Sequence, residues 1–184
     1  RIANKPDACK GKTKVDVEKR TVLSPSKYPH THLKEAQKIA VGIWENYAGR
    51  GASPPDVALA IGVSPTSSAW RVLCGSSIAY GLTAGGHNAD QVTLTPLGRK
   101  LVAPEAEGDD VGARREAMLK PRLAAAFFEK YRRAKFPNDT IAKNVLIGLG
   151  LPVDRAQEAL QIIKANGRYA GMIRDTPTGP FVNL

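Results

Sequence analysis

Residues 64–71, with the sequence SPTSSAWR, carry side chains that could contact an anionic ligand. Thr66, Ser67 and Ser68 provide short hydroxyl groups, and Arg71 follows them about one helical turn later. Such hydroxyls hydrogen-bond to phosphate oxygens, and a guanidinium can donate two parallel bonds to the edge of a guanine. We interpret these four residues as candidate contacts to a nucleic acid.

The pattern around these residues predicts two short helices joined by a tight turn. Ser53, followed by two prolines, is typical of a helix start, because proline is tolerated in the first helical turn. Gly62 is expected to end that helix in the turn, where Ser64 would cap the next helix and Pro65 would open it. The second helix, over about residues 65–80, would present the candidate residues.

A glycine-rich hairpin is predicted after this second helix, over residues 81–95. The segments GLTA and QVTLT flank the loop GGHNAD, and β-branched residues alternate in the second segment. His87 and Asn88 stand at the tip of the loop. They could reach a phosphate or a minor-groove edge, or they could serve turn geometry alone.

The segments AYGLT and VTLTPLGRKLVAP resemble the hairpin entry and exit of the bacterial winged helix-turn-helix superfamily. The resemblance covers roughly residues 30–104. It implies a winged-helix fold, DNA binding as the usual activity, and Thr66 to Arg71 as the residues that match the recognition positions. Arg99 and Lys100, in the helix expected to begin near Pro96, could then contact phosphates.

The remaining chain predicts further helices on either side of an acidic, turn-rich segment. A helix over residues 31–49 has an apolar face and Thr31 as its expected N-cap. Residues 105–112, rich in Asp and Glu, predict a linker between a domain at 28–104 and a second domain at 113–184. A basic helical segment over residues 111–136 should break or kink at Pro121.

The second half repeats the pattern of the first. A short helix, the turn Gly150-Leu151-Pro152, a helix over residues 153–166 ended by Gly167, and a hairpin near the C-terminus are expected. The outward charges of helix 153–166, on Asp154, Arg155, Glu158 and Lys164, cancel. This face therefore predicts packing, dimerisation or a protein partner better than contact with phosphates.

The net charge of +10 favours anionic partners, nucleic acid first. Residues 1–27 contain eight Lys or Arg against three Asp or Glu and predict a flexible basic arm or a solvated tail. Residues 111–135 contain eight against two, and could be a solvated helix face or a surface for a nucleic-acid backbone. The candidates on this segment are Arg114, Arg115, Arg122, Arg132 and Arg133.

The sequence lacks the motifs of several common kinds of catalytic or metal site. The glycines at 85 and 86 lack the Lys-Ser/Thr sequel of a phosphate-binding loop, no GxSxG segment occurs, and no His, Cys, Asp or Glu cluster has metal-ligand spacing. We therefore predict a protein that is not an enzyme and needs no metal or cofactor. Two cysteines, Cys9 and Cys74, and no long apolar run predict a cytoplasmic protein without a disulfide or a membrane span.

Together these features predict a mainly α-helical α+β protein with small β wings. Two tandem winged-helix units would follow the basic N-terminal arm. The function expected first is binding of double-stranded DNA by a transcription regulator, associated with the nucleoid. The alternative is a winged-helix protein-interaction or oligomerisation module of a larger bacterial protein, such as one used in defence, in which helix 153–166 forms a homodimer or binds a partner protein.

Overall fold

A computed structural model describes residues 28–184; the predicted basic arm, residues 1–27, lies outside them. The described chain forms helices and two antiparallel hairpins, and is therefore mainly α with a small β component. The first half contains α1 (Leu33–Tyr47), α2 (Pro54–Ala60), α3 (Ser68–Ala79), β1 (Thr83–Ala84), β2 (Thr93–Leu94) and α4 (Pro96–Val102). The second half contains α5 (Asp109–Leu119), α6 (Arg122–Lys130), α7 (Asp139–Gly148), the 3₁₀ turn η1 (Val153–Arg155), α8 (Ala156–Tyr169), β3 (Ile173–Thr176) and β4 (Gly179–Val182).

The same order of elements occurs in both halves. In the first, α1 leads to Ala52, which forms an isolated antiparallel bridge with Val92 beside the β1–β2 hairpin, and α2 and α3 lie between them. In the second, α6 leads to Lys135, which bridges Phe181 of the β3–β4 hairpin, and α7 and α8 lie between them. Each hairpin therefore gains a third strand, one bridge long, from the segment that precedes the helix pair.

Backbone hydrogen bonds at the turns repeat as well. Where the first helix of each pair ends, Val63 N–H donates to the Ala58 carbonyl at 2.9 Å, and Leu151 N–H to the Leu146 carbonyl at 3.1 Å. A glycine with positive φ precedes each of these donors, at 72° for Gly62 and 98° for Gly150. The predicted turns after α2 and α7 are thus confirmed, with glycine where a left-handed backbone is required.

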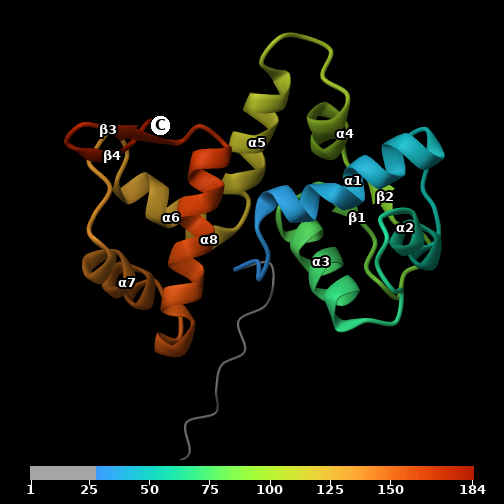
Figure 1. Ribbon diagram of the computed structural model, residues 1–184, viewed down its shortest axis with the longest axis horizontal. Helices are drawn as coiled ribbons and strands as arrows, with labels where there is room; N and C mark the ends of the chain where they lie inside the picture. The colour runs from blue at the N-terminus through green and yellow to red at the C-terminus, as the bar shows by residue number, and fades with distance from the viewer. Residues whose placement is uncertain (1–27) are drawn as a thin grey trace, which may run out of the picture.

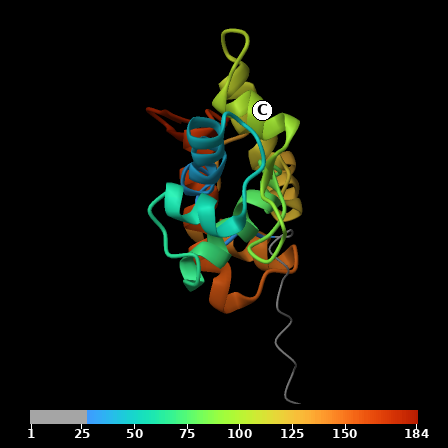
Figure 2. The same ribbon diagram turned by 90° about the vertical axis from the view of Figure 1, so that its right-hand side faces the viewer.

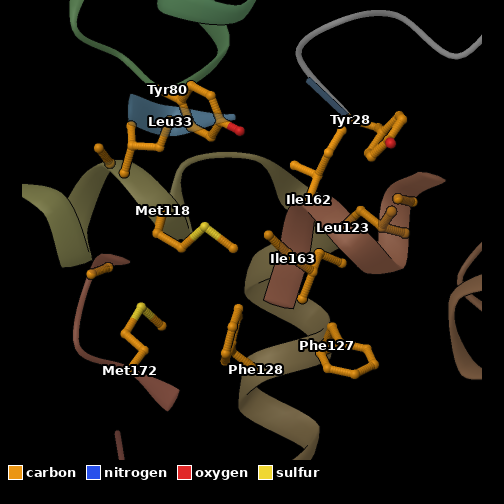
Figure 3. Packing of buried hydrophobic residues seen from close by; sticks show 14 of the residues in the cluster. Tyr28, Leu33, Tyr80, Met118, Leu123, Phe127, Phe128, Ile162, Ile163 and Met172 are labelled. Atoms are coloured by element: carbon orange, nitrogen blue, oxygen red, sulfur yellow. The ribbon is translucent and has the colours of Figure 1, made fainter. Parts of the chain in front are cut away.

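The two halves lie side by side, with α4 and α5 at the top of both views (Figures 1 and 2). One hydrophobic cluster extends through both halves. It joins Leu33 of α1 and Tyr80, which follows α3, to Met118 of α5, Phe128 of α6 and Ile163 of α8 (Figure 3). A second cluster lies within the first half around Ile43, Val57, Trp70 and Cys74. The predicted helices therefore pack into two cores, one of them shared.

A buried polar network crosses the shared core. The Asn166 side chain of α8 is 2% exposed; its Oδ1 accepts from Leu33 N–H at 2.8 Å and its Nδ2 donates to the Tyr80 hydroxyl at 2.7 Å. That hydroxyl donates in turn to the Thr31 carbonyl at 2.7 Å. Asn166 therefore caps the first helix of the other half.

The boundaries of the first-half helices differ from those expected. Helix 31–49 was expected to have Thr31 as its cap, which is wrong: α1 begins at Leu33, and the residue at its N-cap makes no side-chain capping bond. The second helix begins at Ser68 rather than Pro65, and Ser67, not Ser64, caps it. In both places a competing hydrogen-bond acceptor supplies the cap.

The second-half boundaries differ for similar reasons. The break at Pro121 is confirmed, since α5 ends before it and α6 begins after it, but α6 stops at Lys130 instead of continuing to Phe136. Residues 109–112 of the expected linker belong to α5. The helix expected over 153–166 begins as η1 and continues to Tyr169, so that Gly167 lies inside it: a methyl group there would meet Ile173 Cδ1 at 2.6 Å.

Candidate nucleic-acid interface

The first group of candidate residues lies together at the start of α3. Ser67 Oγ accepts from Trp70 N–H at 3.1 Å and donates to the Ser64 carbonyl at 2.7 Å, so that this hydroxyl is engaged in capping the helix. Thr66, Ser68 and Arg71 are exposed. The structure therefore brings the predicted residues of this turn to one surface, where Ser67 positions the others.

The outward surface of α3 is more apolar than charged. Arg71 is the only Lys or Arg in the helix, and its exposed companions include Ala69, Val72 and Ile78. Val72 and Ile78 are each 42% exposed. In a major groove, such methyl groups could contact the thymine C5-methyl, while one guanidinium could contact a guanine.

The hairpin loop presents His87 and Asn88, which are both exposed. Gly85 fixes the base of this loop: its φ is 89°, and a methyl group at this position would lie 2.1 Å from the Gln91 carbonyl oxygen. No larger residue can make this close backbone approach. The loop tip is therefore held away from the core with both polar side chains in solvent.

Two residues of the segment TPLGR, at the start of α4, have structural roles that require their residue types. Thr95 Oγ1 accepts from Gly98 N–H at 2.9 Å, which caps α4, and donates to the Gly81 carbonyl at 2.6 Å. A methyl group on Gly98 would stand 1.9 Å from the Leu82 carbonyl oxygen. Threonine and glycine are thus needed to pack α4 against the entry to the hairpin.

The cations of α4 already have partners within the molecule. The Arg99 guanidinium lies 5.8 Å from the centre of the Trp44 ring. Lys100 Nζ lies 3.0 Å from Asp109, and its hydrogen bond lowers the pKa of that carboxyl group below the ordinary value. Both cations remain exposed. A phosphate bound by either cation would therefore compete with these internal partners.

Arg114 and Arg115 of α5 join this helix to the C-terminal end of α8. Arg114 pairs with Asp110 at 2.6 Å and lies 4.9 Å from the centre of the Tyr169 ring. Arg115 donates to the Ala170 carbonyl at 3.2 Å and to the Gly171 carbonyl at 3.1 Å. These bonds satisfy carbonyls at a helix end, where cations are favoured.

The other candidate arginines are on the second half. Arg122 is exposed in the first turn of α6, and Arg132 and Arg133 are exposed just after this helix. Arg132 lies 3.6 Å from Glu129, and Arg133 has a left-handed backbone with φ of 54°.

The candidate residues do not form one continuous surface. Both views place α4 and α5 at the top, whereas α3 lies below them (Figures 1 and 2). The predicted surface over residues 111–135 is thus divided: its α5 arginines face the end of α8, and its last arginines directly precede Ala134, whose carbonyl accepts from Val182 N–H of the second hairpin. The structure assembles the α3 turn and leaves the basic segment apart from it.

The structure also groups residues that no sequence motif indicated. Arg174 of β3, Phe181 of β4 and Lys135 occupy directly opposed positions on neighbouring strands. All three are exposed. From the sequence alone, only the alternation of polar and apolar residues in the C-terminal hairpin could have suggested this grouping. The strand register was needed to show which residues lie opposite one another.

An exposed apolar surface occupies α7 and the turn that follows it. Ile141 is 49% exposed, Leu149 41% and Val153 73%. An open groove of about 380 Å³ lies along α7, lined by Lys130, Ile141, Asn144, Val145, Gly148 and Leu149. This surface lacks the charge expected of a nucleic-acid contact.

Comparisons of the chain with protein-family models, curated proteins and solved structures found no match. Within residues 28–184, no group of three or more His, Cys, Asp or Glu side chains is placed to hold a metal ion. None of the helices described is both long enough and apolar enough to span a bilayer.

Proposed function

We propose that the chain is a tandem winged-helix module that binds double-stranded DNA through its first unit. The observation that carries the proposal is the repeated order of helix, bridging strand, two helices and hairpin. In the first unit, α3 is the second helix of the pair, with an exposed hydroxyl- and arginine-bearing first turn. That is the helix which helix-turn-helix proteins place in the major groove.

The distribution of charge supports an anionic partner for this unit. Residues 1–27 carry a net charge of +5, equal to that of residues 28–184, which hold 19 Lys or Arg against 14 Asp or Glu. Tyr28, where the basic segment joins the described chain, is buried beside Tyr80, Ile162 and Ile163. The described chain therefore begins between the end of α3 and the middle of α8.

In this proposal α3 enters the major groove by its N-terminal turn. Arg71 donates to a guanine edge, Thr66 and Ser68 contact phosphate oxygens, and Ala69 and Val72 contact thymine methyl groups. The basic segment supplies the salt-dependent, sequence-independent part of the affinity. His87 and Asn88 of the hairpin loop contact the flanking backbone.

The test is titration of a labelled duplex with the full chain over about 50–200 mM salt. We expect affinity to fall steeply with salt, and Arg71→Ala to lose about 1–3 kcal/mol of binding free energy at a site with the preferred guanine. Lys38→Ala is the matched control, because Lys38 is an exposed cation of α1 paired with Glu35. Affinity that is insensitive to salt, or unchanged by Arg71→Ala, refutes the proposal.

A protein-interaction function for the second unit is favoured by its surface. Several charges of η1 and α8 are paired within this unit: Arg155 lies 3.0 Å from Glu158, Lys164 pairs with Asp139 of α7, and Arg168 lies 3.0 Å from Asp175 of β3. The apolar residues of α7 lie beside them. If this surface joins two copies, the mass measured by light scattering rises with concentration, and Leu149→Ser abolishes the rise; a concentration-independent monomer excludes a homodimer.

A further inference from the structure

The second hairpin presents a row of three side chains on its outer face. Phe181 stands between Arg174 on one neighbouring strand and Lys135 on the other, each directly opposite it in the antiparallel register. Opposed residues of antiparallel strands project to the same face of a sheet. The residues next to two of them in sequence, Ile173 and Val182, are 5% and 0% exposed and form the inner face.

The Phe181 ring is available to a ligand. It is 37% exposed, so that part of the ring is accessible from solvent. The cation–π contacts found in residues 28–184 involve the rings of Trp44 and Tyr169, not that of Phe181. Arg174 and Lys135 therefore flank the ring without stacking on it.

Further positive charge precedes Lys135 in the chain. Arg132 and Arg133 are exposed on the segment that leads from α6 to Lys135. Of these cations and the two in the row, Arg132 alone has a carboxylate within ion-pair distance among the described residues, Glu129 at 3.6 Å. The row is therefore an aromatic ring between two cations, and two further arginines lie two and three residues before Lys135.

We propose that this outer face binds single-stranded nucleic acid, with one unpaired base stacked on Phe181 and the adjoining phosphates bound by Arg174 and Lys135. Proteins that bind single strands combine a cationic surface with exposed aromatic rings, because every base offers a face for stacking. Arg132 and Arg133 extend the cationic surface along the strand. The site lies on the second unit and does not depend on α3 or on duplex binding.

The aromatic ring distinguishes this ligand from an acidic peptide. A peptide held by the cations alone would bind equally well if Phe181 were replaced by another apolar residue. A stacked base requires the flat ring, since base–aromatic stacking is lost with an aliphatic side chain. Phe181→Leu, which keeps an apolar side chain, therefore separates the two ligands, and Phe181→Trp should preserve stacking.

The experiment measures fluorescence anisotropy of a labelled oligothymidylate of about 12 nucleotides with the full chain. We expect Phe181→Leu to weaken binding about tenfold and Phe181→Trp to retain it. Arg174→Gln should reduce the slope of log affinity against log salt by about 0.7, the value for one phosphate contact on a single strand. Circular dichroism melting curves confirm that each variant is folded.

Leu59→Ala is the control, because Leu59 is an exposed apolar residue of α2, 66% accessible, in the other unit. It should bind the oligothymidylate as the unmodified chain does. Three results would overturn the inference: no binding of the oligothymidylate, unchanged binding by Phe181→Leu, or equal losses in Phe181→Leu and Leu59→Ala. Arg71→Ala should affect duplex binding alone, so that failure of this inference and failure of duplex binding by α3 are told apart.

Discussion

Replacing Asn166 by leucine tests how the two halves are joined. The side chains are similar in size, but leucine removes the acceptor for Leu33 N–H and the donor to the Tyr80 hydroxyl. Leu33 is the first residue of α1 and fully buried, so its N–H has neither an intrahelical partner nor water. The substitution therefore leaves a buried donor unpaired at the helix start.

The expected loss follows from these contacts. A buried polar group left without its partner costs about 1–3 kcal/mol, and loss of a helix cap about 1 kcal/mol. The Tyr80 hydroxyl keeps its bond to the Thr31 carbonyl, and burial raises the pKa of Tyr80, so the hydroxyl remains a donor. We expect Asn166→Leu to lower the free energy of unfolding by about 2–4 kcal/mol.

Urea unfolding followed by two probes measures this loss. Both tryptophans, Trp44 and Trp70, lie in the first half, whereas far-ultraviolet circular dichroism reports helices of both halves. Coincident transitions show that the halves unfold together, as the shared core predicts. Gln37→Leu is the control: its Oε1 accepts from the Tyr169 hydroxyl of α8 at 2.6 Å, but the site is only partly buried.

The control should lose less than about 1 kcal/mol, because its partner remains accessible to water. A double-mutant cycle with Tyr80→Phe should give a coupling energy of about 1 kcal/mol, since the two side chains share one hydrogen bond. If Asn166→Leu costs no more than about 0.5 kcal/mol, the buried cap does not hold the halves together, and this reasoning is refuted.

Two further substitutions test the packing. In the same urea titration, Gly98→Ala should lower the free energy of unfolding by about 1–3 kcal/mol, because its methyl group would meet the Leu82 carbonyl. Gly112→Ala should raise the free energy of unfolding by about 1 kcal/mol, because Gly112 has open space around it in α5 and alanine favours a helix. In a Cys9→Ser background, Cys74 should resist a thiol reagent at pH 8 until the protein unfolds, since burial raises its pKa to about 12; rapid labelling of the native protein would contradict its burial.

Local sequence patterns determined most of the helices and both hairpins. Ser53 caps α2 through the bond from Asp56 N–H and two prolines follow it, Thr95 caps α4, and Pro121 separates α5 from α6. Each feature acts within about one turn of its own position, because capping and proline effects are local. They are therefore readable before the fold is known.

The candidate site was only partly readable in the same way. The α3 turn was predicted as a group because its members are neighbours in the chain. The contacts of Arg114 and Arg115 could not be predicted in this way. Their partners, Tyr169 and two carbonyls at the end of α8, are far away in sequence. A cation in a basic segment can be free in solvent or bound to another part of the chain. Only the packing of the helices determines which of the two occurs.

The sequence by itself determined the order of elements in each half and the excess of positive charge. The tertiary structure decided where side chains meet across the chain: Asn166 caps a helix that starts 133 residues earlier, and Arg174, Phe181 and Lys135 form one row. The physical reason is that a hydrogen bond or a cross-strand pair depends on distance in space. Helix periodicity and turn composition specify which face of an element is apolar, but not which residue of another element that face will meet.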